Sequence, residues 1–409
     1  MAISVVIAGA GIAGLSAAFH LAERGARPIV VLDKGKVGSG SSSRAGAINT
    51  MLMETEATTR ARGISFDIFE RFDRILDDYQ FHQVGCLAIY NDEQYETASQ
   101  LHPMHHRMSA KIEVLNRRKV EDRFPDLQLQ NNECGVLDLR GGYSEPERYI
   151  PALAAETRRL GVEIREDTAI ERLLVRNGRV QGVVLNDGQE LTADATVCTV
   201  NAWANGLLAK AGQSLPVRNF VIERHVTQPF SREPRLPAVN DDVRGIYYRP
   251  TEDRRLLIGD GAHGFAQASM PDRDFEMQTL EPNPACKPFL KKALRGRLPM
   301  MDGAEFDHHR VGLVSYPIDF KPNIGPVAAL PGLYLGTHFC SGGFGYHPVA
   351  GLLLAQHIVN GKTGFDASEF SPDRFNGMDT LEYLKQEVPY SDMVEAHAAN
   401  TVGFVRKRH

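Results

Sequence analysis

The chain has 409 residues, of which 43% are hydrophobic and 24% charged, a composition typical of a globular protein that excludes a disordered or collagen-like chain. The formal net charge is −5, so no basic excess favours a nucleic-acid partner. The length favours two or three domains.

The cysteines are few, scattered and without a C-x-x-C pair, which argues against a disulfide framework and against a zinc or iron–sulfur site. We therefore expect free thiols in a reducing compartment and a cytoplasmic protein. The first 22 residues are apolar but lack a basic start and contain three glycines, so a folded strand and helix are expected rather than a signal peptide. No run of about 18 apolar residues predicts a transmembrane helix.

The N-terminal segment contains the strongest motif. Residues 4–8 are typical of a buried strand, residues 9–14 (GAGIAG) follow, and residues 15–24 have a helical pattern. A second strand at 28–32 ends on Asp33, nineteen residues after Gly14. In this context G-x-G-x-x-G predicts a dinucleotide site, with phosphates at the helix N-terminus. Asp33 would accept hydrogen bonds from the adenosine ribose.

Further elements follow in chain order. The patterns predict helices at 54–80, 93–124, 148–160, 286–295 and 349–359, and strands at 84–90, 162–164, 170–175, 180–185, 196–200 and 327–335. The dipeptides Asn177-Gly178 and Asp187-Gly188 predict hairpin turns. Residues 216–320 read mainly as short strands and loops, and 375–409 as a charged tail.

FAD and NAD share the N-terminal motif, and the rest of the chain favours FAD. The predicted parallel sheet is left near residue 50 and resumes near 150 and near 330, whereas an NAD enzyme would usually continue it at once. A glycine cluster at 342–346 precedes Pro348, which we expect to open the last long helix. A helix N-terminus can stabilise the negative charge that a reduced flavin bears at N1 and C2=O.

These motifs together resemble those of the D-amino acid oxidase and sarcosine oxidase family of FAD-dependent oxidoreductases. The resemblance covers about residues 3–375. It rests on six motifs: residues 6–14, Ser42-Ser43-Arg44, Gly141-Gly142-Tyr143, Asn201-Ala202-Trp203, residues 322–326 and residues 341–348.

The resemblance implies an α/β fold with a Rossmann-like FAD-binding domain made of three segments, 1–50, 146–205 and 322–374. An inserted α+β substrate domain on a mixed sheet would comprise 51–145 and 206–321, followed by the tail. No histidine or cysteine near Ser43 or Gly312 matches the attachment residue of some relatives, so non-covalent FAD is expected.

The resemblance also implies cofactor contacts. The 42–44 segment would line the flavin ring, Ile170 would meet the adenine, 201–203 would lie by the pyrophosphate, and 342–346 would cover the pyrimidine edge. The full expected set is Gly9, Gly11, Ile12, Ala13, Gly14, Asp33, Lys34, Ser42, Ser43, Arg44, Ala47, Ile170, Asn201, Ala202, Trp203, Gly312, Gly342, Gly343, Phe344, Gly345 and Tyr346.

The substrate site is less defined. Many relatives place a carboxylate-binding arginine two residues after the glycine that matches Gly312, where this chain has Val314. The pattern at 315–319 is closer to the sarcosine and dimethylglycine branch and to β subunits of amine or opine dehydrogenases. The expected catalytic set is Arg249 as anion clamp, Tyr248 and Tyr316 orienting the amine, and His263 facing the flavin. Adjacent His308 and His309 would point in opposite directions on a strand, so no metal is predicted.

The function implied is oxidation of the C–N bond of a secondary amine or amino acid, such as an N-substituted glycine, by hydride transfer to flavin N5 and imine hydrolysis. Two alternatives stay open: a 2-hydroxy acid or polyol phosphate as substrate, or a non-catalytic FAD-bound assembly subunit. Oxygen, a quinone or a partner protein would accept the electrons. We expect no integral membrane segment.

Overall fold

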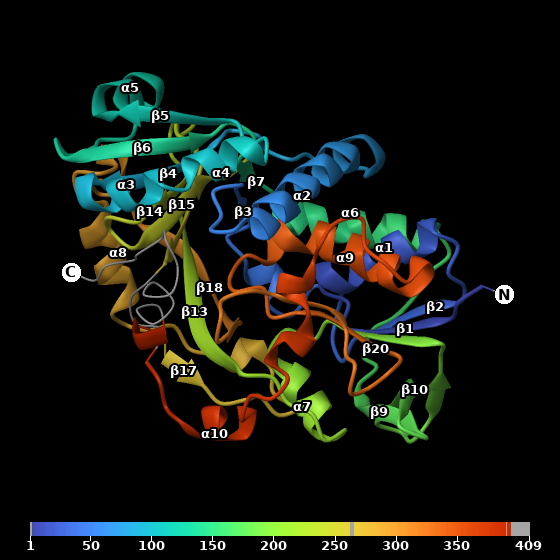
Figure 1. The fold of residues 1–409 in the computed structure, drawn as a ribbon. Coiled ribbons are helices and arrows are strands. Elements are labelled where there is room, and N and C mark those ends of the chain that lie inside the picture. Colours follow the sequence, from blue (N-terminus) through green and yellow to red (C-terminus); the bar gives the residue numbers. More distant parts are fainter. Residues whose placement is uncertain (1, 262–265, 390, 394–409) are drawn as a thin grey trace.

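The computed structural model describes residues 2–261, 266–389 and 391–393. Two large sheets lie side by side, with most of the long helices above one of them (Figure 1). Among the described residues, no helix is both long enough and apolar enough to cross a membrane.

The first sheet has six strands, and its centre is parallel. β1 pairs in parallel with β2 and β12, and only the edge strand β19 is antiparallel. Every residue of β1 is buried, as expected for a strand covered on both faces. The strand order is β19 (Asn323–Pro326), β20 (Leu333–Thr337), β12 (Ala195–Cys198), β1 (Val5–Ala8), β2 (Ile29–Leu32) and β8 (Glu163–Arg165).

Helices and a small sheet cover the two faces of this sheet. Its helical side is formed by α1 (Ile12–Glu23), α2 (Glu56–Ile75), α6 (Pro146–Arg159) and α9 (Gly343–Asn360). Its other side packs on β9 (Ile170–Arg176), β10 (Arg179–Leu185) and β11 (Glu190–Thr192). Leu173 and Val180 of this small sheet share a core with Val6 and Leu32.

The second sheet is mixed and has nine strands. β13 (Val217–Thr227) is its long central element, because it pairs with three others, β16 (Leu256–Asp260), β17 (Ala266–Ala268) and β18 (Phe306–Pro317). The sheet continues through β15 (Ile246–Pro250), β14 (Ala238–Asp241), β4 (Cys86–Asn91), β6 (Glu133–Asp138) and β5 (Ile112–Asn116). Helix α8 (Cys286–Leu294) packs on one face. A two-stranded ribbon, β3 (Ile48–Asn49) and β7 (Gly142–Tyr143), completes the strands.

The two large sheets draw their strands from the stretches that the sequence analysis assigns to the two domains. All six strands of the first lie within 1–50, 146–205 and 322–374, and all nine of the second within 51–145 and 206–321. The division itself stays a proposal.

Most predicted elements are confirmed within a few residues. The hairpin turn at Asn177-Gly178 has positive φ angles of 51° and 71°, as such a two-residue loop requires. Short helices are α3 (Asp92–Ser99), α4 (His102–Arg107), α5 (Arg117–Arg123), α7 (Ala204–Ala209) and α10 (Thr380–Lys385).

Three predictions of local structure were wrong. Residues 93–124 are not one helical region, because the edge strand β5 interrupts them; only Leu115 of β5 is buried, so it lacks an alternating apolar pattern. Residues 327–335 are not one strand, since a turn separates β19 from β20. Helix α9 begins at Gly343 and contains Pro348, so Pro348 does not open it.

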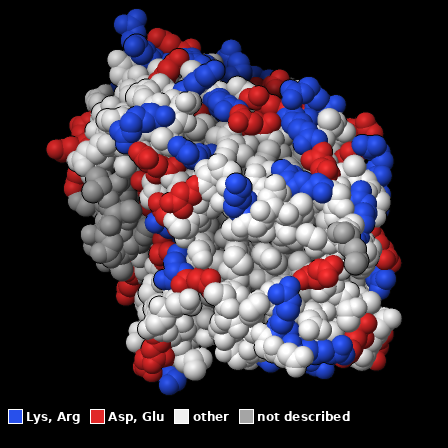
Figure 2. All heavy atoms as spheres, turned by 45° about the vertical axis from the view of Figure 1, so that its right-hand side comes forward, with Lys and Arg blue, Asp and Glu red and all other residues white. Residues whose placement is uncertain are grey.

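Charges of both signs are interspersed on the surface. On the face shown in Figure 2, positive and negative side chains alternate around a largely uncharged centre. This face presents no extended positive field of the kind that polyanions require.

Candidate active site

The turn from β1 into α1 is built from main chain. Gly9 has a φ of +101°, and a Cβ atom at Gly14 would lie 1.9 Å from the Gly9 carbonyl oxygen. Gly11 is the N-cap residue and forms no side-chain cap. The Ile12 N–H donates to Ser42 Oγ at 3.1 Å. The positive N-terminus of α1 therefore suits a pyrophosphate group that binds to main-chain N–H groups.

The Asp33 carboxylate is fixed directly after β2. It accepts hydrogen bonds from the Ala10 N–H at 2.7 Å and from the Gly35 N–H at 2.9 Å. Burial raises the Asp33 pKa, and these two hydrogen bonds oppose the rise. Lone pairs beyond these two bonds can accept from ribose hydroxyls, so the carboxylate is suitably placed for an adenosine.

Residues 201–203 follow β12 as a short 3₁₀ turn beside this end. Asn201 has a φ of +42°, and its Nδ2 donates to Ser41 Oγ at 3.2 Å. Lys34 Nζ lies 4.4 Å from the centroid of the Trp203 ring. Lys34 also donates to carbonyls of the 272–275 loop, and Trp203 Nε1 donates to the Asp272 carbonyl at 2.9 Å. This loop therefore closes over Lys34 and Trp203. Ala202 is buried here, and Ile170 is half-buried at the start of β9.

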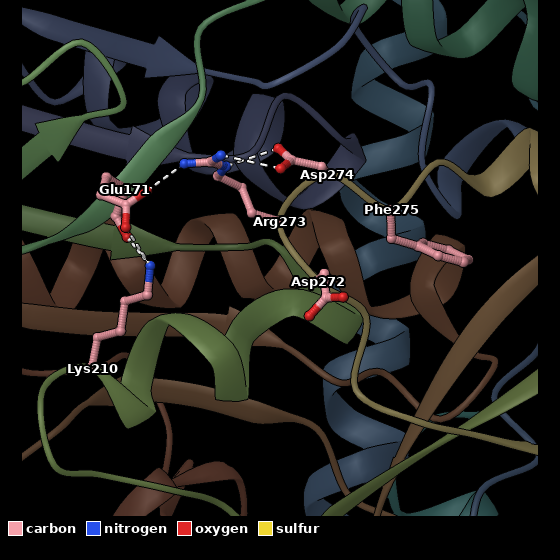
Figure 3. Close-up of a pocket in the computed structure, with 6 residues that line it drawn as sticks. All are labelled: Glu171, Lys210, Asp272, Arg273, Asp274 and Phe275. Atoms are coloured by element: carbon pink, nitrogen blue, oxygen red, sulfur yellow. Dashed lines mark hydrogen bonds and ion pairs between the residues drawn. The ribbon is translucent and has the colours of Figure 1, made fainter.

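A hollow of about 530 Å³ lies beside that loop, lined by Glu171, Lys210, Asp272, Arg273, Asp274 and Phe275. As Figure 3 shows, Glu171 pairs with both Lys210 and Arg273, and Arg273 pairs with Asp274. Exposed ion pairs of this kind contribute little to stability. The charged groups that form them are already paired with one another and offer no free charge to a substrate. We do not assign the substrate to this hollow.

The 42–47 loop is held between the two sheets. Arg44 donates to the carbonyls of Val311 at 2.8 Å and Gly40 at 2.8 Å, and its stem lies over Gly312, where a Cβ atom would come within 2.7 Å of Arg44 Cδ. Burial lowers the Arg44 pKa. Ser43 is half-buried, and Ala47 has a φ of +57°.

Arg224 anchors the same loop and was missed by the sequence analysis. This buried side chain of β13 donates to the carbonyls of Ser43 at 3.0 Å and Arg44 at 3.1 Å. It thereby ties the second sheet to the predicted flavin loop. Nothing in its local sequence distinguishes it from a surface arginine.

The approach to α9 is strained. His338, Cys340 and Ser341 have φ angles of +59°, +51° and +63°, a region that non-glycine residues rarely adopt. Such strain persists where the surroundings impose it, and it clusters at functional sites. The Ile12 side chain would lie 3.9 Å from a Cβ atom at Gly343, so the starts of α1 and α9 are neighbours.

A buried arginine faces the start of α9. Arg62, on α2, is 6% exposed and its Cζ lies 4.0 Å from the centroid of the Tyr346 ring. Its Nη1 and Nη2 fill the space left by Gly345 and Gly342, where Cβ atoms would lie 1.1 Å and 2.4 Å away. Within the described residues, its Nε has no hydrogen-bond partner.

Arg62 forms no ion pair with a carboxylate in the part of the chain that the structure describes. Burial lowers its pKa, and the groups that oppose this most are Tyr346, Cys86 and Cys340, none of them a carboxylate. The helix dipole adds further positive potential at the same place. Phe344 is buried in this first turn. The arrangement thus suits an anionic or electron-rich ligand.

Two buried histidines flank this helix start and are neutral at physiological pH. His347 Nε2 lies 2.6 Å from Tyr149 Oη, and His338 Nδ1 lies 3.0 Å from Asn323 Nδ2. Burial lowers the pKa of each histidine to about 3. These two imidazoles therefore add no positive charge to that of Arg62.

The predicted catalytic set is divided by the structure. Arg249 is fully buried and forms a bidentate ion pair with Glu145, at 2.9 Å for both bonds, and it also donates to the Gly46 carbonyl at 2.7 Å. Its charge is therefore balanced by the protein itself. Adjacent residues of β15 face opposite sides, so Tyr248 points into the core under α8, away from Arg249.

Tyr247 is the tyrosine on the Arg249 face. Cβ atoms at Gly46 and Gly259 would lie 2.5 Å and 2.1 Å from its ring, so the ring packs between the two glycines. Alternation along the strand was the signal that could have found it. Tyr316 is buried with Phe220 near Cys340, beside the approach to α9. His263 lies outside the described residues.

Comparison with known proteins agrees with this geometry. Residues 4–357 match the family model for FAD-dependent oxidoreductases. The chain is 26% identical to 4-methylaminobutanoate oxidase (formaldehyde-forming) of Paenarthrobacter nicotinovorans over 94% of the chain and 47% of that protein. It is 25% identical to sarcosine oxidase subunit beta of Rhizobium meliloti (strain 1021), over 91% and 88%.

Among solved structures, L-proline dehydrogenase from P. horikoshii has the same fold, with a TM-score of 0.84 and 24% identity over 91% of this chain and 98% of that one. The chain spans about half the length of several curated relatives that it matches, including dimethylglycine dehydrogenases. The match over residues 4–357, together with the glycine turn and the paired helix starts, shows that the chain belongs to the FAD-dependent oxidoreductase family and that its cofactor is FAD.

Proposed function

We propose that this chain oxidises the C–N bond of a secondary amine that bears a carboxylate, such as an N-methyl amino acid. The single observation on which the substrate class rests is Arg62, a buried cation at the start of α9 that forms no ion pair with a carboxylate of the described residues. A ligand carboxylate would pair with this guanidinium in a bidentate geometry.

The chemistry divides between cofactor and protein. Bound FAD supplies the acceptor for a hydride leaving the carbon next to nitrogen. The nitrogen lone pair then completes a C=N bond, and water hydrolyses this imine to an amine and a carbonyl compound. The protein's part is to hold the substrate, and such positioning can contribute several orders of magnitude in rate.

Two side chains are assigned to positioning in this proposal. Arg62 holds the carboxylate against the start of α9, and Tyr346 fixes the guanidinium plane by stacking under it. Arg249 instead keeps Glu145 and the Gly46 carbonyl in place. We therefore transfer the anion-clamp role from Arg249 to Arg62.

The relatives support this substrate class. The names of two of them, 4-methylaminobutanoate oxidase and sarcosine oxidase subunit beta, denote N-methyl amino acids as substrates. The second name also denotes a subunit, so a partner chain or a protein electron acceptor belongs to this proposal. All five cysteines are free, as expected for the cytoplasm that we propose as the compartment.

The test is anaerobic mixing of the FAD-loaded chain with sarcosine, 4-methylaminobutanoate, N-methylpropylamine and a 2-hydroxy acid. We expect the two N-methyl amino acids to bleach the flavin and the amine without a carboxylate to do so far more slowly. Bleaching by the 2-hydroxy acid alone would overturn the proposal in favour of alcohol oxidation.

The variant Arg62→Ala separates the clamp from the reaction. We expect it to retain FAD and to lose about 100-fold in kcat/KM for the carboxylate substrates, mainly through KM, because a buried charge-paired contact is removed. Exposed Arg60 lies on the same helix, so Arg60→Ala is the matched control. An equal loss for N-methylpropylamine would show that Arg62 does not bind the carboxylate.

A further inference from the structure

A second polar cluster lies on the opposite face of β13 from the candidate active site. Arg224 points towards the 42–44 loop, whereas its neighbours Glu223 and His225 point to the other face, because side chains alternate along a strand. Cys286, the first residue of α8, meets them there. Two separate parts of the sequence, β13 and the start of α8, thus bring a carboxylate, an imidazole and a thiol together.

The three side chains lie close together and are almost fully buried from solvent. One ligand atom from each lies within 4.8 Å of the others. His225 is 0% exposed, Cys286 5% and Glu223 7%. His225 Nε2 lies 3.0 Å from Glu223 Oε2, and the Asn283 N–H donates to Glu223 Oε1 at 3.0 Å. The carboxylate is therefore oriented by the main chain.

One ring nitrogen of His225 is unpartnered. Nε2 faces Glu223, whereas Nδ1 is buried and has no hydrogen-bond partner among the described residues. An orphaned nitrogen of this kind costs free energy unless a donor or a cation meets it. His309 of β18 lies directly across from His225 in the strand register, and the two ring centroids are 5.8 Å apart. His309 is not part of the group whose ligand atoms lie within 4.8 Å of one another, so its ring would have to turn towards them to supply a fourth donor.

We propose that Glu223, His225 and Cys286 bind a zinc ion, with His309 as the fourth ligand. Nitrogen, sulfur and carboxylate donors in a four-coordinate set are those that Zn²⁺ prefers. Zinc–ligand bonds of about 2.0–2.3 Å require the donor atoms of Glu223, His225 and Cys286 to approach one another by about 1 Å from their present spread, and require a larger movement of His309. Cys286 loses its proton to solvent when its sulfur binds the metal, so the charges balance.

A closed set of four protein ligands makes this a structural site rather than a catalytic one. The ion would fasten α8 to β13 and β18, on the face away from the flavin loop. Its loss would lower stability and would not remove the flavin contacts that the α1 and α9 starts provide. The site is thus independent of the proposed amine chemistry.

The test is metal analysis of the FAD-loaded chain after incubation with a small excess of zinc sulfate and exhaustive dialysis. We expect about one zinc per chain, a loss of at least tenfold in Cys286→Ala and in His225→Ala, and no change in the matched control Cys134→Ala. Zinc should also raise the Tm of the chain and leave that of Cys286→Ala unchanged.

Cobalt gives a second readout that does not depend on the folding of a variant. With Co²⁺ in place of zinc, a thiolate-to-cobalt charge-transfer band should appear in the difference spectrum of the FAD-loaded chain before and after metal addition. Absence of stoichiometric zinc, or equal zinc in Cys286→Ala and the unaltered chain, would overturn the proposal and leave a hydrogen-bonded cluster.

Discussion

The starts of α1 and α9 are neighbours, yet they are prepared in different ways. At α1 the main chain forms the site: Gly9, Gly11 and Gly14 form the turn, and no side chain caps the helix. At α9 a charged side chain, Arg62, comes from another helix and fills the space beside two glycines. The first arrangement suits a phosphate held by main-chain N–H groups, and the second suits a ligand that needs a fixed positive charge.

The difference teaches where each kind of site can be recognised. A main-chain site can be recognised from consecutive residues, because every group that forms it lies in one turn. A site formed by side chains of two helices has no such local sequence motif. The following predictions test whether the two helix starts differ in this way.

The largest effect is expected from Gly14→Val. Its Cβ atom would lie 1.9 Å from the Gly9 carbonyl oxygen, so α1 must move away from β1. We expect the chain to purify without flavin, measured as the ratio of flavin to protein absorbance. Gly40→Ala, where a Cβ atom meets nothing within 4 Å, should retain the cofactor. Normal flavin content in Gly14→Val would show that the turn does not hold FAD.

The corresponding change at the other helix start is Gly345→Ala. A Cβ atom there would lie 1.1 Å from Arg62 Nη1, so the guanidinium must be displaced. We expect flavin content to be retained and kcat/KM for a carboxylate substrate to fall about 10- to 100-fold, about 1.4 to 2.8 kcal/mol. Steady-state kinetics measure this. Loss of flavin instead would mean that the two helix starts act alike.

The pH dependence of stability should come in part from the α9 side. His338 and His347 have a pKa of about 3 in the folded chain, below the ordinary value of about 6.5. The unfolded chain therefore binds more protons between these values, and the free energy of unfolding falls as the pH drops below 6.5. At pH 5.5 each histidine should lower the free energy of unfolding by about 1.4 kcal/mol.

Urea unfolding at pH 7.5 and 5.5 measures this loss. His347→Gln should remove about half of the contribution of the two histidines, and exposed His308→Gln serves as the surface control. A larger free energy of unfolding at pH 5.5 than at pH 7.5 would contradict the prediction.

The smallest effect is expected from the tyrosine pair of β15. Tyr247→Phe should lower kcat/KM about fivefold if its hydroxyl orients the substrate, since one hydrogen bond contributes about 1 kcal/mol. Tyr248→Phe should leave the kinetics unchanged, because it removes a buried hydroxyl that has no hydrogen-bond partner among the residues that the structure describes. Parallel kinetic measurements compare the two; a loss in Tyr248→Phe alone would reverse their roles.

Much of the fold was predictable, because its signals are local. The strand, glycine turn and Asp33 follow one another in sequence, and the Asn177-Gly178 hairpin is determined by its two turn residues. The edge strand β5 was missed because its side chains are mostly exposed and show no alternation. Propensity alone cannot identify a strand that exists through pairing with β6.

The substrate side was less predictable, since its contacts are made between distant residues. Arg249 was a reasonable anion clamp in sequence, and only the structure shows Glu145, 104 positions away, already paired with it. Arg62 has no motif spacing, and Cys286 meets Glu223 and His225 only through the packing of α8 on β13. Strand alternation relates Tyr247 to Arg249, and in the same way relates Glu223 to His225.

Strand β13 presents Arg224 on one face and Glu223 and His225 on the other. This arrangement restricts insertions and deletions within the strand. Inserting or deleting a single residue upstream within the strand would exchange the two faces, placing acid and imidazole against the flavin loop and the guanidinium under α8. Homologous chains should therefore diverge here by point replacement, while length variation is confined to the connecting loops.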